Sequence, residues 1–79
     1  MRSIEERITK ILIDDFKVRH ANIGPDTTFN DLAIDSLVIV ELVLVLAKEF
    51  AIPLHDGELT DTMTIREAAE VLVAKGALP

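Results

Sequence analysis

One serine has neighbours that suggest chemistry: Ser36, in the tripeptide Asp35-Ser36-Leu37. A hydroxyl at the first position of a helix lies beside unpaired backbone N–H groups and partial positive charge, so a phosphodiester attached there is electrostatically favoured. Asp35 is a good N-cap for such a helix, and Leu37 would give a modifying enzyme an apolar contact beside the hydroxyl. The tripeptide alone is weak evidence, because an inert serine in the first turn of a capped helix has the same sequence.

Other polar residues are weaker candidates for a site. His20 and His55 are far apart without the spacing of metal ligands, so we expect exposed histidines. The pair Asp14-Asp15 is typical of a solvated helix surface rather than of a general acid and base. Three further acids do not match a calcium loop, although they could extend an acidic partner surface or bind cations loosely: Asp56, Glu58 and Asp61. We therefore predict no catalytic residue and no metal site.

The charge of the chain is negative and unevenly distributed. The net charge is −6, and residues 21–79 carry ten acids against three bases. Such a surface repels phosphate backbones and anionic lipid, which argues against nucleic-acid and membrane partners. It suits basic protein partners, although an acidic surface kept for solubility has the same composition.

The size of the chain favours a module on which other proteins act. Its 79 residues predict one domain, 1–79, with one modest core and little room for a walled catalytic cleft. There is no cysteine, so any thiol chemistry needs an imported thiol. The charged N-terminal residues lack a secretory pattern, and the longest apolar stretch is too short to span a bilayer. We expect a cytoplasmic monomer.

The elements that would position Ser36 are helical. Ser3 and Glu6 have the spacing of a capping box before a helix of about four turns. The apolar residues of this helix recur on one face: Ile4, Ile8, Ile11, Leu12 and Phe16. Residues 21–35 carry turn chemistry and predict a long loop held to the core by four apolar side chains: Ile23, Phe29, Leu32 and Ile34.

A second helix is predicted from Ser36 to about Phe50, because fifteen residues without a turn signal are too long for an ordinary strand. At helical spacing one face holds Ile39, Leu42, Val43, Leu46 and Phe50. The opposite face holds Leu37, Val40, Glu41, Leu44 and Lys48. A helix that is apolar nearly all round is fully buried or has a partner-binding face, and we expect the second in so small a domain.

The remaining sequence predicts one short and one longer helix. Residues 58–62 are expected to form a short helical turn that holds Leu59 inward, after a turn at 55–57. Thr64 and Glu67 form a second capping box before a last helix that Gly76 can close. The predicted fold is all-α, a small four-helix bundle with three longer helices, one short helix and a long loop between the first two.

The whole chain resembles the acyl carrier protein family. The resemblance rests on five stretches: Ile4-Glu5-Glu6-Arg7, Asp31-Leu32, Asp35-Ser36-Leu37, Val40-Glu41-Leu42-Val43 and Glu49-Phe50 with Ile52-Pro53. It implies a 4'-phosphopantetheine arm from coenzyme A, attached to Ser36 by a phosphopantetheinyl transferase that uses Mg²⁺. The arm would hold acyl groups as thioesters for acyl-transferring and acyl-modifying enzymes of fatty-acid, lipid or polyketide-type biosynthesis. Carriers of aminoacyl groups, and a helical adaptor without a prosthetic group, are the alternatives.

The sequence departs from the family pattern in two places. Ala33 stands where glycine usually precedes the Asp-Ser-Leu motif by two residues. Val38, Ala47 and Lys48 stand where the partner-facing side of the second helix is often acidic. The predicted partner face therefore consists of Leu37, Val38, Val40, Glu41, Leu44 and Lys48. Its composition suggests a specialised carrier that serves a dedicated pathway.

Overall fold

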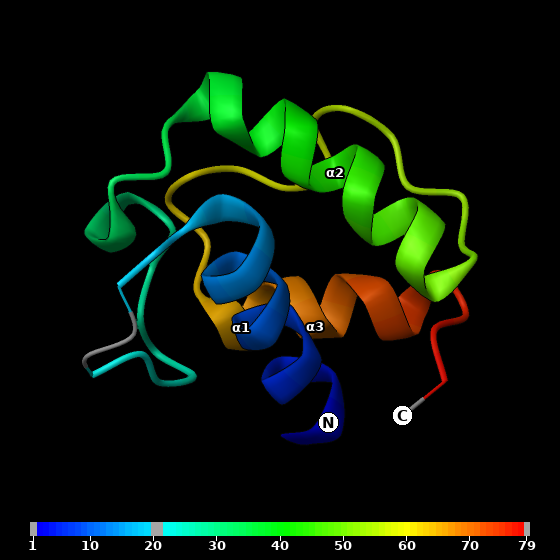
Figure 1. Ribbon diagram of the computed structural model, residues 1–79. Coiled ribbons are helices and arrows are strands. Elements are labelled where there is room, and N and C mark those ends of the chain that lie inside the picture. The colour runs from blue at the N-terminus through cyan, green and yellow to red at the C-terminus, as the bar shows by residue number, and fades with distance from the viewer. Residues whose placement is uncertain (1, 20–21, 79) are drawn as a thin grey trace.

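Three α-helices and one 3-10 turn make up the bundle. In the computed structural model, which describes residues 2–19 and 22–78, they are α1 (Arg2–Phe16), η1 (Asn30–Leu32), α2 (Ser36–Phe50) and α3 (Ile65–Ala74). Figure 1 shows α2 along one side of the molecule and α3 along the other, with α1 in front of the first part of α3. No strand forms in the described residues beyond an isolated bridge between Thr28 and Thr64. The predicted all-α fold is confirmed.

The apolar faces predicted for the first two long helices are the ones that pack into the core. In α1 the side chains of Ile4, Ile8 and Leu12 are fully buried. The predicted inner face of α2 is buried throughout, and α3 contributes Ile65, Ala68, Ala69 and Leu72. These residues form one cluster with Phe29 and Ile34 from the long loop. Burial of this apolar surface is the main force that holds the helices together.

Two predictions about local structure are wrong. Ser3 is not the N-cap of the first helix, because α1 already begins at Arg2. No helix forms over residues 58–62, where the chain makes turns and bends instead. Leu59 is nevertheless buried as expected. The short helix of the fold is η1, which lies in the loop before Ser36.

The long loop before α2 is fastened to the segment that leads into α3. The Phe29 N–H donates to the Met63 carbonyl at 3.2 Å, and the Ile65 N–H donates to the Thr27 carbonyl at 2.9 Å. An ion pair joins Arg66 to Asp26 at 2.6 Å. Phe29 itself is fully buried. These contacts give the loop a defined path, so the residue that follows it is held in place.

Candidate functional site

The approach to Ser36 is a short turn stabilised by two side chains. The Thr28 N–H donates to Asp31 Oδ2 at 3.2 Å, and the Asp31 N–H donates to Thr28 Oγ1 at 3.0 Å. This reciprocal pair encloses the start of η1. Its signal, a threonine followed three residues later by an acid, is present in the sequence but was not used in the prediction.

The turn ends at Ala33, which adopts the left-handed backbone conformation, with φ 60° and ψ 28°. The Ala33 N–H donates to the Asn30 carbonyl at 3.0 Å, and the chain then reverses toward α2. Glycine reaches this conformation without the steric cost that a Cβ adds. The site therefore uses the geometry that a glycine would favour, although alanine occupies the position.

Asp35 caps α2 as predicted. Its Oδ1 accepts a hydrogen bond from the Val38 N–H at 3.0 Å, and its carbonyl accepts from the Ile39 N–H at 2.9 Å. Ser36 is the first residue of the helix and is exposed. The N–H groups of Ser36 and Leu37 have no acceptor within the described residues. An exposed hydroxyl thus lies beside two unpaired donors at the positive end of a helix.

The outer face of α2 is largely apolar and open to solvent. Leu37 is 78% exposed, Leu44 is 66% exposed and Val40 is 42% exposed. Glu41 and Lys48 are also exposed on this helix. Val38 differs from the other residues of the predicted partner face, because it is only partly exposed and packs against the core.

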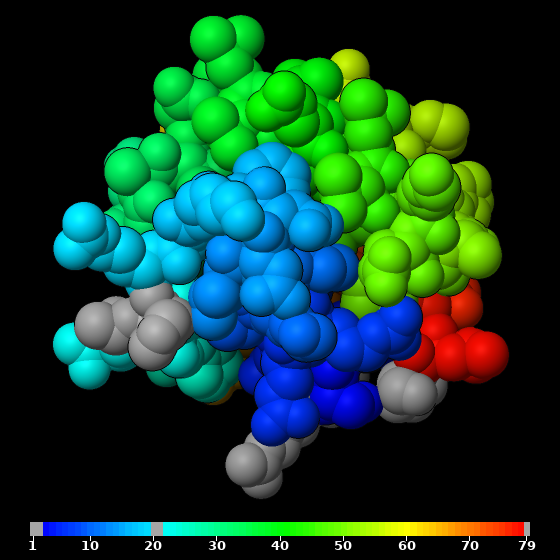
Figure 2. Space-filling model, in the orientation of Figure 1, coloured from blue at the N-terminus to red at the C-terminus, as the bar shows by residue number. Residues whose placement is uncertain are grey.

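A groove of about 510 Å³ lies between the end of α1, the turn at η1 and the start of α2. Its apolar lining consists of Phe16, Val18, Leu32, Ile34 and Val38, together with Ala33. Three charged residues also line it: Lys17, Arg19 and Asp31. In Figure 2 the light-blue atoms at the end of α1 lie next to the green atoms that lead into α2. This groove could not be predicted from the sequence, because its walls come from three separate segments.

Comparison with known proteins identifies the family and the fold. Residues 6–72 match the family model described as the phosphopantetheine attachment site. The chain belongs to this family. Among solved structures, it is similar to an acyl carrier protein from Thermotoga maritima, with a TM-score of 0.80 and 19% sequence identity. The match covers 94% of this chain and 87% of that chain. At this level of identity the match establishes an acyl-carrier fold.

The cofactor of this phosphopantetheine-attachment domain is 4'-phosphopantetheine, and the start of α2 fits it chemically. Serine oxygen is the atom type that a phosphodiester linkage needs, and Ser36 is exposed to an approaching transferase. The unpaired N–H groups of Ser36 and Leu37 suit the negative charge of a phosphodiester. Neither neighbour obstructs the hydroxyl, because the Asp35 side chain is engaged with the Val38 N–H and Leu37 points into solvent.

The weaker candidates of the sequence analysis have structural roles or none. Asp14 accepts a hydrogen bond from Lys10 Nζ at 2.9 Å, which raises the pKa of that lysine. His55 is exposed and its N–H donates to Glu58 Oε2 at 2.8 Å, whereas His20 lies outside the described residues. Hydrogen bonds from Lys75 and from the His55 N–H lower the pKa of Glu58.

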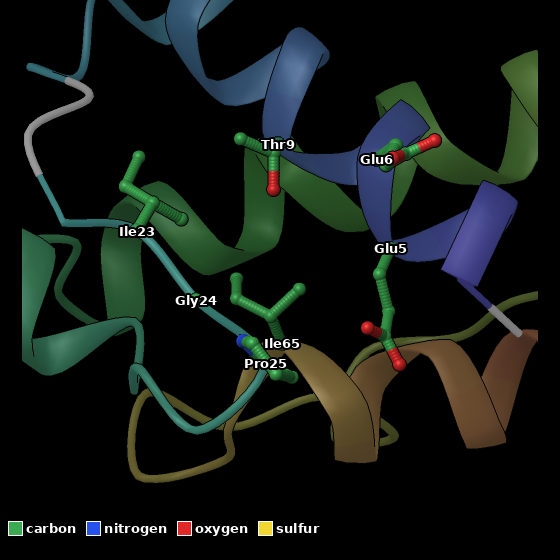
Figure 3. Close-up of a pocket in the computed structure, with 7 residues that line it drawn as sticks. All are labelled: Glu5, Glu6, Thr9, Ile23, Gly24, Pro25 and Ile65. Carbon is green, nitrogen blue, oxygen red and sulfur yellow. The ribbon is translucent and has the colours of Figure 1, made fainter.

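A separate pocket of about 280 Å³ lies between α1, the long loop and the start of α3, with no residue of the Ser36 region in its lining. Figure 3 shows Ile23, Pro25 and Ile65 across from Thr9, and the carboxylates of Glu5 and Glu6 point in different directions. These two acids therefore do not form a paired catalytic site. No helix in the described part of this carrier is long and apolar enough to cross a bilayer.

Proposed function

We propose that residues 1–79 form a single acyl carrier domain, a cytoplasmic monomer that carries 4'-phosphopantetheine on the Ser36 hydroxyl. The observation that carries the proposal is an exposed serine at the first residue of α2, held there by the Asp35 cap, within a chain of the phosphopantetheine-attachment family. When bound, the arm supplies a terminal thiol that holds acyl groups as thioesters. The chain supplies the attachment oxygen and the surface that partners recognise.

The loading step is a phosphoryl-type transfer from coenzyme A, catalysed by a phosphopantetheinyl transferase. The Ser36 oxygen forms a new bond to phosphorus, and a bond within the coenzyme A diphosphate breaks. The leaving group is 3',5'-adenosine bisphosphate, and the serine proton passes to the transferase. Two features of the chain favour the product: the positive end of α2 and the unpaired N–H groups of Ser36 and Leu37. Asp35 positions the first turn of the helix.

The decisive experiment is intact mass after incubation with coenzyme A, Mg²⁺ and a promiscuous phosphopantetheinyl transferase. We expect the mass of one phosphopantetheinyl group, localised to Ser36 by fragmentation, and one new reactive thiol in a chain that has no cysteine. The Ser36→Ala variant should gain neither. Modification of Ser3, or of a threonine in the Ser36→Ala variant, would contradict the assignment, and an unchanged mass would favour an adaptor without a prosthetic group.

The outer face of α2 is the surface we propose for partner enzymes. Its members are Leu37, Val38, Val40, Glu41, Leu44 and Lys48. Three large apolar side chains of this set are exposed, which is costly unless a partner covers them. The resemblance implies acyl-transferring and acyl-modifying enzymes that approach Ser36 along this helix. The apolar composition of the face suits a dedicated partner with an apolar docking surface.

A further inference from the structure

Two cations lie unpaired at the edge of the groove beside Ser36. Lys17 and Arg19 are exposed, and neither has an ion-pair partner in the described part of the chain. Lys10, Arg66 and Lys75, in contrast, each contact a carboxylate. In a chain with a net charge of −6, these two cations, close together in sequence, form a local concentration of positive charge. They favour a bound group that brings negative charge.

The end of α1 places these cations over the groove. Lys17 adopts a positive φ of 57°, and the Val18 N–H reaches back to the Leu12 carbonyl at 3.0 Å. This hydrogen bond between residues six positions apart closes the helix and turns the chain. Val18 then packs against the core while its two neighbours remain exposed. Residues 17–19 therefore present one apolar and two basic side chains to the same groove.

The floor of the groove is apolar and reaches both sides of Ser36 in the sequence. Ile34 precedes Ser36 by two residues and Val38 follows it by two, and both line the groove. The lining contains one acid, Asp31, whose carboxylate already accepts a hydrogen bond from the Thr28 N–H. The charged lining is therefore positive in sum, and the anionic group of an occupant would meet cations at its edge.

We propose that this groove is a docking site for the chain's own prosthetic arm, with Lys17 and Arg19 at its phosphodiester and the apolar floor under its pantetheine portion. The inference rests on the proposed attachment at Ser36. An arm tethered there starts within two residues of two lining side chains, Ile34 and Val38. The arm has one negative charge for the two cations, and its methyl and methylene groups can contact the apolar floor while its hydroxyl and two amide groups face solvent.

Val38 gains a specific role in this arrangement. An acid at this position, where other members of the family often carry one, would place a charge on the apolar floor under the pantetheine portion of the arm. Valine instead continues the apolar lining formed by Leu32 and Ile34. The departure from the family pattern that we noted in the sequence therefore matches a docked arm as well as an apolar partner.

Methyl NMR spectra of the unloaded and the loaded protein test the proposal. Loading should shift the methyl resonances of Val18, Leu32, Ile34 and Val38. The double variant Lys17→Gln, Arg19→Gln should still load fully by intact mass. Its docked-to-free ratio should fall roughly three- to tenfold, as expected for the loss of two exposed charge contacts, and the methyl shifts should shrink accordingly.

The matched control is the double variant Lys10→Gln, Arg66→Gln, which removes the same charge at positions outside the groove. It should keep the full methyl shifts. Full loading with shifts confined to residues 35–37, or located between α2 and α3, would overturn the docking proposal and leave the attachment at Ser36 intact. Equal methyl shifts in the groove variant and in the control variant would overturn the role of Lys17 and Arg19. A chain that does not gain the arm would overturn both proposals.

A second variant tests the apolar floor of the groove. Val38→Asp should reduce the shifts of Val18 and Leu32 on loading, because it places a carboxylate on the apolar floor of the groove. Val73→Asp makes the same exchange on α3, outside the groove, and should leave them unchanged. Unreduced shifts in Val38→Asp would contradict the proposed path of the arm.

Discussion

Ala33 shows how a single backbone angle shapes the approach to Ser36, the proposed attachment residue. Its φ of 60° lies in the left-handed region, where a Cβ is crowded against the backbone. Neighbouring contacts hold it there: its N–H donates to Asn30, and the Ile34 side chain that follows is buried. The cost of the conformation is borne by the folded state and is absent when the chain unfolds.

Ala33→Gly should therefore raise the free energy of unfolding, by roughly 1 kcal/mol after the greater freedom of glycine in the unfolded chain is subtracted. Chemical denaturation at constant m-value measures the change. The matched control is Ala47→Gly within α2, where φ is helical and glycine should lower the free energy of unfolding by about 1 kcal/mol. Destabilisation by both substitutions would show that the backbone at Ala33 carries no such cost.

At the residue scale, the features that depend on residues close in sequence could be predicted. Asp35 and Ser36 were assigned correctly as cap and first helical residue, because capping depends on neighbours three positions apart. The unpaired state of Lys17 and Arg19 could not be predicted, since it depends on which acids the fold brings near. The left-handed backbone conformation of Ala33 could not be predicted either, because an alanine, unlike a glycine, does not indicate such a conformation.

The helix α2 combines the proposed attachment residue with the proposed partner face, so its surface charge bears on partner choice. Exposed ion pairs contribute about 0.2–1 kcal/mol each. Partners that use basic residues to recognise an acidic second helix would lose contacts at Val38, Ala47 and Lys48. Docking to such a partner should weaken by roughly 1–2 kcal/mol, or about 5- to 30-fold in affinity.

We therefore expect a ketosynthase of ordinary fatty-acid synthesis to use the acylated protein poorly. The triple variant Val38→Asp, Ala47→Glu, Lys48→Glu should recover much of the loss, measured as kcat/KM for the loaded carrier. A control with the same change in net charge places the acids elsewhere: Val73→Asp, Ala74→Glu and Lys10→Glu. If the unmodified chain already performs as well as a conventional carrier, the specialised role is wrong, although the carrier assignment stands.

The contact between Glu58 and Lys75 joins the segment after α2 to the end of α3. This hydrogen bond, with a smaller contribution from the His55 N–H, lowers the pKa of Glu58 in the folded state from its ordinary value of 4.5. A lowered pKa means that the folded state favours the ionised carboxylate. Its stabilising effect is therefore complete above pH 4.5 and is lost as the pH falls through the lower, folded-state pKa.

Glu58→Gln should accordingly lower the melting temperature at neutral pH, and the difference from the unmodified protein should close in acid. Glu70→Gln removes an equal charge from an exposed acid of α3 that has no ion-pair partner among the described residues, so it should not lower the midpoint at neutral pH. Thermal melts across a pH series distinguish the two variants. A Glu58→Gln difference that is independent of pH would contradict the assigned ion pair.

Among the elements, the bounds of α2 were predicted correctly and those of the shortest helix were not. The second helix has a strong cap at Asp35 and a stop signal at Pro53, both readable from sequence. Residues 58–62 have no comparable cap or stop signal in the sequence. Glu58 forms its contacts with His55 and Lys75, so it stabilises a turn instead of the start of a helix.

At the scale of the molecule, the uneven charge sets how stability responds to salt. Ten acids against three bases in residues 21–79 should destabilise the folded state by self-repulsion at low ionic strength. Moderate salt, or divalent cation at roughly millimolar concentration, should raise the melting temperature because screening weakens this repulsion. Thermal melts across a salt series measure the effect.

A variant with fewer acids provides the comparison. Asp56→Asn with Glu70→Gln removes two exposed carboxylates and should show a smaller rise of the midpoint with salt. A flat or falling midpoint in the unmodified protein would count against self-repulsion as a factor in its stability.

Ser36 and the apolar side chains Leu37, Val40 and Leu44 belong to one helix. If Ser36 carries the arm as proposed, an enzyme that binds that helix also fixes the point from which the arm extends. Recognition of the helix and delivery of the cargo to the enzyme then occur in the same encounter. The cargo reaches the enzyme's active site at an effective concentration that depends on the length of the tether, and not on how much loaded carrier the solution contains. A brief, weak encounter is therefore sufficient for transfer, and a carrier of this design gains turnover by releasing its partners quickly.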